Sequence, residues 1–286
     1  MSALSLGQLA GLACLWEATA SKPGNVHRAA DFEDVTFVDF AVSALAIQPV
    51  FDRAAPGARL GEIVLDAISA TRQAVGTNTN LGTVLLLAPL AIADEPIAAG
   101  VARVVHSLDQ HDATLVYDAI RLAQPGGMGH VEKADVSGPP PDDLLAAMRL
   151  AADRDLVARQ YVNNFAEVLE VVVPAIGDAL GQAWPLGEAI VHAQLRLMSQ
   201  FPDSLIARKC GPAVARQSAA MAAAALAAGR PGDEAYHRTL ADFDFWLRAD
   251  GHRRNPGTTA DLIAAGLFTA LRQGIIKLPV RFYATT

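Results

Sequence analysis

Apolar residues recur along most of this chain at intervals of three and four positions. Such intervals place apolar side chains on one face of a helix, whereas a half-buried strand needs strict alternation of apolar and polar residues. The pattern therefore predicts an all-α fold. The segments predicted to be helical are 4–20, 36–54, 60–75, 81–93, 97–107, 109–123, 142–152, 155–180, 185–200, 203–209, 212–229, 232–249 and 256–273.

Two apolar runs, at residues 83–90 and 167–176, could instead form buried strands. Neither alternates polar with apolar positions and neither leads into a hairpin turn, so we interpret both as helix. Composition supports this interpretation. Hydrophobic residues make up 52% of the chain and aromatic residues only 6%, and abundant alanine and leucine favour helices over sheets.

Residues that commonly begin and end helices stand at several predicted boundaries. An aspartate or asparagine before a helix caps its free N–H groups, a proline fits the first helical position, and a glycine follows the last turn. The predicted caps are Asp109, Asp142 and Asn255, the last followed by Pro256, and the helix-ending glycines are Gly229 and Gly274. The final stretch, KLPVRFYATT, is predicted to be extended.

A loop rich in glycine and proline, QPGGMGHVEKADVSGPPP at 124–141, interrupts the helical pattern. Apolar helices flank it on both sides, and it lacks the composition of a flexible Ser/Gly linker. Loops of this kind between packed helices are more often functional than mere connectors. We therefore expect a single all-helical domain over residues 1–286 with a functional loop at 124–141.

The overall composition argues against several classes of protein. A formal net charge of −7 disfavours binding to nucleic acid through a basic face. Cys14 and Cys210 belong to no CxxC pair or Cys/His cluster, so neither a zinc site nor a disulfide framework is indicated. The longest apolar run, 81–93, is shorter than the roughly 20 residues that span a bilayer. We expect a cytoplasmic protein without nucleic-acid or membrane partners and leave a homodimer open.

The candidate chemistry lies in five polar segments at predicted helix ends. We number them along the chain as residues 22–28, 76–82, 126–135, 203–209 and 252–261. In the first segment, Lys22, His27 and Arg28 surround a Pro-Gly turn and could bind phosphate. The alternative is a solvated loop whose cations lie near the C-terminus of the first helix, where they are mildly stabilising.

The second and third segments carry weaker signals. Asn78, Thr79 and Asn80 could contact a substrate, or they could simply supply the turn and cap before a helix. In the third segment, glycines allow backbone N–H groups to approach an anion. It is neither a Walker A sequence, since no Gly-Lys-Ser/Thr follows, nor a convincing GxGxxG, since no strand precedes it.

The fourth and fifth segments each combine acidic and basic residues. Asp203 could cap a short helix or serve in a site. In the fifth segment, two arginines precede a helix whose first turn has hydroxyls and no acid, which suits phosphate. Asp261 then falls in an apolar run, where a carboxylate needs a metal or an arginine as partner, and a structural ion pair is the alternative. Asp242 and Asp244 lie two positions apart, so they diverge on a helix and only one of them can face a given pocket.

Taken in order, the five segments resemble the triphosphoribosyl-dephospho-CoA synthase family, which includes the CitG and MdcB proteins. The matching motifs are Glu17 with Lys22-Pro23-Gly24; Gly76, Asn78, Thr79 and Gly82; Gly126-Gly127 with Glu132; Asp203, Ser204, Ile206, Arg208 and Gly211; and Asn255-Pro256-Gly257 with Ala260-Asp261-Leu262. They span residues 17 to 262. The resemblance implies an all-α enzyme that makes 2′-(5″-triphosphoribosyl)-3′-dephospho-CoA and adenine from ATP and 3′-dephospho-CoA.

The resemblance also implies roles for individual residues and an expected Mg²⁺ ion. Asp203, Asp261, Glu132 and Glu17 are the candidate catalytic carboxylates, with Asp203 and Asp261 as candidate magnesium ligands. The candidate contacts to phosphate and substrate are Lys22, Asn25, His27, Arg28, Asn78, Thr79, Asn80, Gly126, Gly127, Ser204, Arg208, Lys209, Arg253, Arg254, Asn255, Gly257, Thr258 and Thr259.

The sequence departs from the citrate-lyase branch of this family at two places. Asn25 and His27 replace residues of its Pro-Gly-Leu-Val-Asp motif, and Asn80-Leu81 replaces a His-Lys pair. The sequences SKPGNVHR and NPGTTADL are more similar to those of a branch found in methanogens and in bacteria with methanopterin-linked one-carbon metabolism. A related ATP-dependent transferase with another acceptor is therefore an alternative, and a non-catalytic helical nucleotide-binding module is a second.

Overall fold

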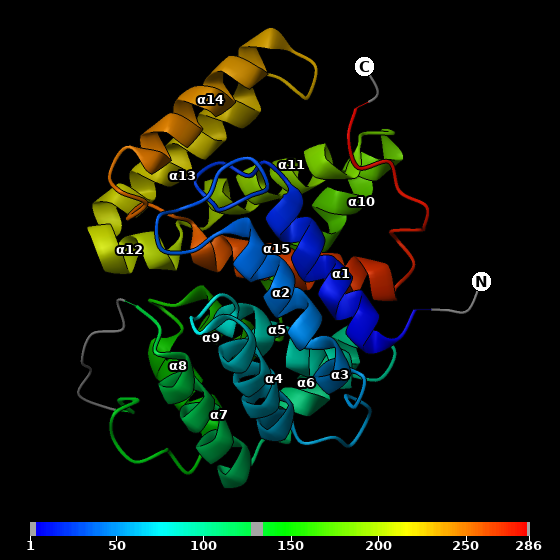
Figure 1. The fold of residues 1–286 in the computed structure, drawn as a ribbon, viewed down its shortest axis with the longest axis vertical. Helices are drawn as coiled ribbons and strands as arrows, with labels where there is room; N and C mark the ends of the chain where they lie inside the picture. Colours follow the sequence, from blue (N-terminus) through cyan, green and yellow to red (C-terminus); the bar gives the residue numbers. More distant parts are fainter. Residues whose placement is uncertain (1–3, 127–133, 285–286) are drawn as a thin grey trace. The chain divides into compact units, whose positions relative to one another are not determined.

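The computed structural model describes residues 4–126 and 134–284. Within them the chain forms helices joined by loops and turns, and it contains no strand (Figure 1). The all-α prediction is therefore confirmed. Both runs that could have been strands are helical, residues 83–90 within one α-helix and residues 167–176 as a π-helical turn leading into another.

The chain divides into two compact units. The first comprises Met1–Leu15 and Val38–Ala166, and the second comprises Trp16–Phe37 and Glu167–Thr286. The first helix, α1 (Leu6–Thr19), begins in the first unit and ends in the second. This division into units does not test whether residues 1–286 form one domain, so that statement stays a prediction.

The first unit is built around α5, in which every residue except Gly82 is buried. Helices α4 and α7 pack closely because Gly61 has no side chain: a Cβ there would lie 2.8 Å from Leu115 Cβ. The helices of this unit after α1 are α2 (Phe37–Ala46), α3 (Gln48–Phe51), α4 (Leu60–Val75), α5 (Leu81–Ile92), α6 (Ile97–His106), α7 (Gln110–Ala123), α8 (Leu144–Ala151) and α9 (Leu156–Val162).

The second unit has two cores. The apolar side of α15 is buried beside the π-helical turn η1, where Gly266 allows Val172 to approach. A separate cluster joins α11, α13 and α14 around Tyr236, Phe243 and Leu247. The elements are η1 (Glu167–Val172), α10 (Val173–Gly181), α11 (Leu186–Gln200), α12 (Ser204–Cys210), α13 (Pro212–Ala227), α14 (Glu234–Arg248) and α15 (Gly257–Arg272).

Two predicted helices are broken in the structure, so their predicted extents were wrong. The segment 36–54 divides into α2 and α3. The segment 155–180 is interrupted after α9, where Asn164 and Phe165 adopt positive φ angles of 57° and 64°. This break buries the Phe165 ring completely beside Tyr161, 5.8 Å between centroids. Burial of an aromatic ring offsets the cost of the left-handed backbone.

Two of the three predicted N-caps were wrong. Asp109 caps α7 in a reciprocal capping box with Asp112, as predicted. The cap of α8 is Asp143, while the Asp142 carboxylate accepts from Gln110 Nε2. Asn255 does not cap α15 either, because its side-chain oxygen accepts a hydrogen bond from another loop.

The predicted helix-ending glycines and the extended tail agree with the structure. Gly229 and Gly274 follow α13 and α15 with positive φ angles of 140° and 68°. The tail forms no strand over its described residues, and its Arg281 and Phe282 carbonyls accept from the N–H groups of Leu186 and Gly187 at the start of α11.

Among the described residues, no single helix is both long and apolar enough to cross a membrane. Helices α5 and α6 reach the required length and composition only together, and they are bent by 109° at the break between them.

Candidate functional site

Three of the five polar segments meet in the second unit. The first segment follows α1, the fourth forms the start of α12, and the fifth leads into α15 (Figure 1). Hydrogen bonds connect them: Asn25 bonds to Asn255, and Asp203 bonds to Thr259. The first pair is 230 residues apart in sequence and the second pair 56, so the meeting of the segments is a consequence of the fold. We take this cluster as the candidate site.

Gly24 shapes the first segment at this site. Its φ angle is +75°, and its N–H donates to Asp244 Oδ1 at 2.7 Å. A Cβ here would lie 2.7 Å from Leu247 Cδ1 and 2.9 Å from Pro256 Cδ. Both the backbone angle and the close packing therefore require glycine.

Two residues of α14, Asp244 and Arg248, belong to the site; the sequence analysis considered Asp244 only as an alternative to Asp242 and did not consider Arg248. The Arg248 Nε group lies 2.8 Å from Asp244 Oδ1, and Nη2 donates to the Asn25 carbonyl at 2.6 Å. Together they clamp the turn at Gly24. The spacing of four residues between an acid and an arginine on a helix was the available signal. As predicted, Asp242 diverges from Asp244, and its side chain is exposed.

Asp203 joins two helices at their N-termini. Its Oδ1 accepts from the N–H groups of Leu205 and Ile206, at 2.8 and 2.9 Å, and so caps α12. Its Oδ2 accepts from the N–H and Oγ1 groups of Thr259 in the first turn of α15, at 2.7 and 2.8 Å. The side chain is fully buried. Burial raises the pKa of this carboxyl group, whereas the four hydrogen bonds lower it.

This contact corrects the expectation that the first turn of α15 lacks an acid. The helix contributes none itself, but Asp203 supplies a carboxylate from α12. Beside it, Ser204 Oγ donates to Thr258 Oγ1 at 3.0 Å. The hydroxyls of Ser204, Thr258 and Thr259 are thus engaged within the protein, and the free α15 N-terminus expected from sequence is partly filled.

Lys22 is not the open cation that its sequence position suggested. Its side chain is fully buried, and Nζ lies 2.7 Å from Glu17 Oε1, whose side chain is 10% exposed. Glu17 and Lys22 therefore form a buried ion pair next to the turn at Gly24.

His27 is not a cation at neutral pH. Burial, and then the charges of Arg248 and Lys22, lower its pKa to about 4. Its Nδ1 accepts from the Ala29 N–H at 3.2 Å, so the proton of the neutral ring lies on Nε2. His27 can donate one hydrogen bond through Nε2 but does not contribute positive charge.

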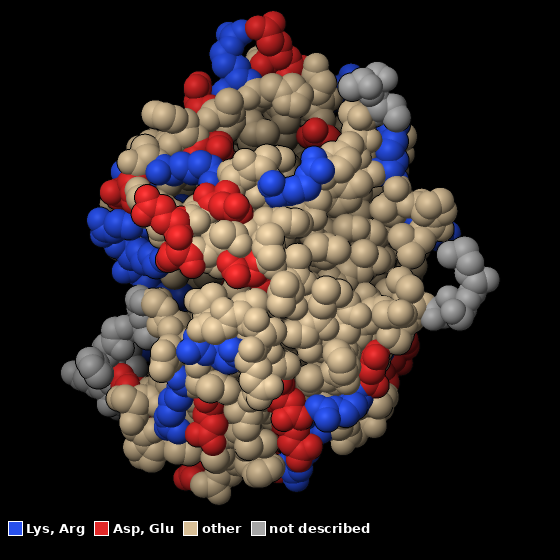
Figure 2. Space-filling view, viewed as in Figure 1, with Lys and Arg blue, Asp and Glu red and all other residues tan. Residues whose placement is uncertain are grey.

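The remaining predicted cations differ in how freely they can reach a ligand. Arg28 and Arg208 are exposed and Lys209 is half-buried, whereas Arg254 lies over the Trp246 ring and donates to its carbonyl at 2.9 Å. Lys and Arg side chains gather over α12 in Figure 2. Arg253 is exposed as well and donates to the Lys209 carbonyl.

The predicted magnesium ligands fit such an ion poorly. All four hydrogen bonds of Asp203 already occupy its two oxygens, so it has little capacity left for a metal. Asp261 is half-buried on α15 and takes part in further interactions of its own. Within residues 4–126 and 134–284, no group of three or more His, Cys, Asp or Glu residues could hold a metal ion.

The second and third polar segments lie in the first unit. Asn78 Oδ1 accepts from the Leu81 N–H, Thr79 Oγ1 lies 2.6 Å from Ser43 Oγ, and Asn80 Nδ2 donates to Thr71. Asn78 and Asn80 therefore help to fix the start of α5, the first through Leu81 and the second through Thr71. Gly126 is exposed, while Gly127 and Glu132 lie outside the described residues.

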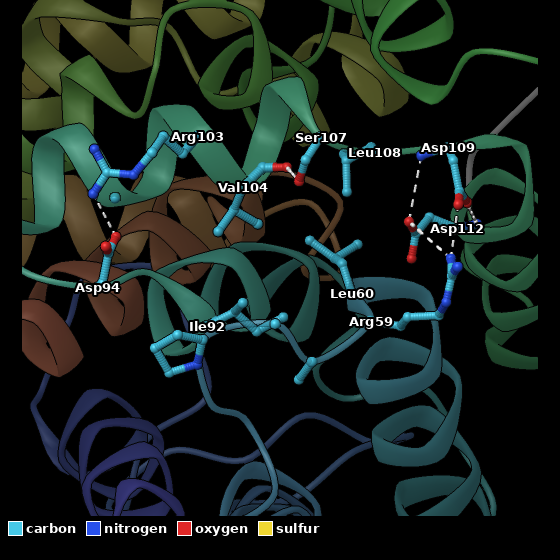
Figure 3. Close-up of a pocket in the computed structure, with 14 residues that line it drawn as sticks. Arg59, Leu60, Ile92, Asp94, Arg103, Val104, Ser107, Leu108, Asp109 and Asp112 are labelled. Carbon is cyan, nitrogen blue, oxygen red and sulfur yellow. Dashed lines mark hydrogen bonds and ion pairs between the residues drawn. The ribbon is translucent and has the colours of Figure 1, made fainter.

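A cleft of about 440 Å³ in the first unit contains none of the predicted site residues (Figure 3). Ion pairs stand at its two ends, Arg103 with Asp94 and Arg59 with Asp109, and apolar side chains lie between them. All four charged groups are about half exposed and already paired. We therefore keep the cluster of the second unit as the candidate site.

Residues 3–278 match the model of a family described as CitG, ATP:dephospho-CoA triphosphoribosyl transferase. The chain belongs to the CitG family. The match covers all five polar segments, including the two in the first unit. The family resemblance seen in the sequence is therefore confirmed.

A solved structure supports membership of the CitG family. It is a crystal structure from Archaeoglobus fulgidus under the provisional name triphosphoribosyl-dephospho-CoA synthase. The two chains are 28% identical and superpose with a TM-score of 0.62, over 81% of this chain and 98% of the archaeal one. None of the curated proteins matches this sequence.

Proposed function

We propose that this protein transfers the triphosphoribosyl group of ATP to 3′-dephospho-CoA and releases adenine. The observation that carries the proposal is the match of residues 3–278 to the CitG family. The meeting of three polar segments in the second unit supports it, because an enzyme of this kind must gather cations, carboxylates and amides around one nucleotide.

In this reaction the bond between C1″ of the ATP ribose and adenine N9 breaks. A new bond forms between C1″ and the 2′ oxygen of the acceptor, whose hydroxyl proton is lost while adenine gains a proton. Positive charge develops at C1″ in the transition state. The site must therefore hold the triphosphate, assist proton transfer and place the acceptor hydroxyl next to C1″.

The accessible cations are the groups best suited to hold the triphosphate. Arg28 and Arg208 are exposed, and Lys209 lies beside Arg208 at the end of α12. Charge-assisted hydrogen bonds from arginine to phosphate are short and strong. Lys22 is paired with Glu17 and is not available to the triphosphate, and neutral His27 adds one N–H donor.

Asp261 is our candidate for the base that takes the acceptor proton. Asp203 would have to give up hydrogen bonds to two helix N-termini in order to react, and Glu17 is held by the buried Lys22 ammonium. Asp261 is half-buried on α15. The roles predicted for Glu132, Asn78, Thr79, Asn80, Gly126 and Gly127 stay predictions.

Mg²⁺ would arrive with the triphosphate in this proposal. Magnesium sites commonly combine substrate phosphates with only one or two carboxylates, so a full protein cage is not needed. Neither predicted ligand is assigned to the ion in this proposal, because hydrogen bonds fill both oxygens of Asp203 and Asp261 is the proposed base. Bound magnesium would neutralise phosphate charge.

The proposal is tested by mass spectrometry of the products formed from ATP and 3′-dephospho-CoA. We expect adenine and the triphosphoribosyl adduct in equal amounts. Release of ADP or AMP instead would overturn ribosyl transfer. Adenine release that requires a methanopterin-type acceptor would keep the chemistry and replace the acceptor, and nucleotide binding without any product would indicate a binding module.

A variant pair tests the base. Asp261→Asn keeps the size of the side chain and removes its basicity, so we expect kcat to fall by about 100-fold, a typical effect for a general base. The control is Asp242→Asn on α14, whose exposed side chain should leave kcat unchanged. If Asp261→Asn retained wild-type kcat, the proton would have to go to another group.

A further inference from the structure

Three side-chain amides form a continuous chain through the second unit. Gln194 on α11 donates from Nε2 to Asn25 Oδ1 at 2.9 Å, and Asn25 donates from Nδ2 to Asn255 Oδ1 at 2.7 Å. Gln194 was not among the residues selected from the sequence. We refer to Gln194, Asn25 and Asn255 as the amide chain.

Backbone carbonyls fix the direction of this chain. The Pro23 carbonyl can only accept, and Gln194 Nε2 lies 3.2 Å from it, so the NH2 group must point that way. The second proton of the same group then meets Asn25 Oδ1. At the other end, Asn25 Nδ2 also donates to the Pro256 carbonyl at 3.4 Å. Reversing any amide would bring two acceptors or two donors together.

Burial shows which part of Gln194 the site uses. Gln194 and Asn25 are 0% and 4% exposed, and no described residue donates a hydrogen bond to the buried Gln194 Oε1. An unsatisfied buried acceptor destabilises the fold, and an apolar side chain of similar size would avoid this cost. The NH2 group of Gln194, with its two hydrogen bonds, is therefore the functional part of the side chain.

Asn255, the last residue of the amide chain, presents an N–H donor beside α15. Because Asn255 Oδ1 is held by Asn25, its Nδ2 must point the other way, and no described residue accepts from it. A Cβ built on Gly257, the first residue of α15, would lie 3.7 Å from this nitrogen. An N–H donor therefore stands at the start of the helix, where an oxygen would repel an anion.

We propose that Gln194 is a positioning residue that acts through Asn25 to hold the Asn255 amide with its NH2 group toward the triphosphate of the nucleotide. The identity of the ligand rests on the proposed function, whereas the direction of the amides rests on the hydrogen bonds alone. Gln194 is too deeply buried to touch the substrate itself.

Gln194→Met tests the proposal because it keeps the length of the side chain and removes both donors. Without them the Asn25 amide can turn, and Asn255 can turn its oxygen toward the nucleotide. We expect the KM for ATP to rise about tenfold, the size of effect expected for one hydrogen bond to a charged group. We expect kcat to change less than about threefold, since the reacting atoms are untouched.

The matched control is Gln160→Met on α9, another glutamine that is 0% exposed but lies outside the candidate site. A structural effect alone would lower the melting temperature of both variants and leave both KM values at that of the wild type. That result for Gln194→Met would overturn the positioning role.

Should Gln194→Met not fold, Asn255→Asp tests the accessible end of the chain. It replaces the proposed donor by a carboxylate oxygen, so the KM for ATP should rise at least tenfold, and an unchanged KM would overturn the proposal.

Side-chain amide exchange, followed by NMR, separates failure of the chain from failure of the proposed function. We expect slow exchange of the Asn25 NH2 protons in the wild type and fast exchange in Gln194→Met. If the wild-type protein releases no adenine, the proposed function fails and amide exchange alone decides whether the chain exists. Fast exchange in the wild type would overturn the chain, whatever the reaction.

Discussion

Single residues at the candidate site have roles that their types alone do not reveal. Lysine, histidine and arginine follow one another in the first polar segment and look alike as phosphate ligands. In the structure Lys22 is buried against Glu17, His27 is neutral and Arg28 is exposed. The electrostatic contribution of each depends on burial and neighbours.

Gly24→Ala should destabilise the protein by about 3 kcal/mol, because a positive φ angle costs roughly 1 kcal/mol and a clash in a packed site adds more. The control is Gly76→Ala, since Gly76 has a similar φ of +71° but open space around its Cβ position. Urea unfolding of both variants measures the two costs separately. Equal destabilisation of the two variants would mean that close packing against Leu247 contributes nothing to the cost of Gly24→Ala.

His27 should make the stability depend on pH. Its pKa is about 4 in the folded protein, below the ordinary value of 6.5. Between these pH values the unfolded chain binds more protons than the folded protein. The contribution of His27 to the free energy of unfolding is therefore fully present above pH 6.5 and is lost as the pH falls toward 4. After allowance for solvent screening we expect a loss of about 2 kcal/mol.

Urea unfolding at several pH values measures this effect. His27→Asn should flatten the curve between pH 4 and 6.5, and replacing the exposed His106 on α6 by asparagine should not. A wild-type curve that is already flat in this range would contradict a neutral His27.

At the scale of elements, the candidate site lies at the ends of helices. Short α12 and long α15 begin side by side because both start at the carboxylate of Asp203. The same residue satisfies N–H groups in two helices, which would otherwise be left without partners in a buried place. Sequence patterns identified the cap of α12 and could not identify the bond to α15.

Asp203→Asn should cost about 3 kcal/mol, because the amide must place an NH2 group against the N–H donors of one of the two helices. Asp155→Asn provides the comparison, because Asp155 caps α9 through two N–H groups of its own helix. Asparagine caps about as well as aspartate, so this change should cost only about 0.5 kcal/mol, from the lost charge. Thermal unfolding of both variants measures the difference. Equal losses would show that the bond to Thr259 adds nothing.

At the scale of the whole molecule, the net charge opposes the proposed ligand. The chain carries a formal charge of −7, and ATP is a polyanion, so binding must depend on local cations more than on the overall field. The concentration of Lys and Arg side chains over α12 is the local exception (Figure 2).

Arg208→Gln and Arg238→Gln each remove one positive charge and separate local from overall electrostatics. Arg238 pairs with Glu234 in the first turns of α14, away from the site residues at its other end. We expect Arg208→Gln to raise the KM for ATP about tenfold and Arg238→Gln to raise it less than about twofold. Steady-state kinetics at two salt concentrations measures this, and similar changes in both variants would argue for the overall field.

Sequence alone determined the helical architecture, because apolar spacing, composition and cap residues act locally and need no tertiary partner. Most helix positions, the α7 and α12 caps, the glycines at helix ends and the family followed from it. It could not determine the break at Asn164, where burial of Phe165 outweighs local propensity. Nor could it show that Asn255 turns toward Asn25 instead of capping α15.

Tertiary structure alone decided which polar residues act together. It brought the first, fourth and fifth segments into one cluster and added Arg248 and Gln194. It also showed that Asp244, not Asp242, faces the cluster, and that Lys22 and His27 are buried. The physical reason is that charge, hydrogen-bond direction and pKa depend on neighbours distant in sequence. Periodicity along the chain carries no information about those neighbours until the helices pack.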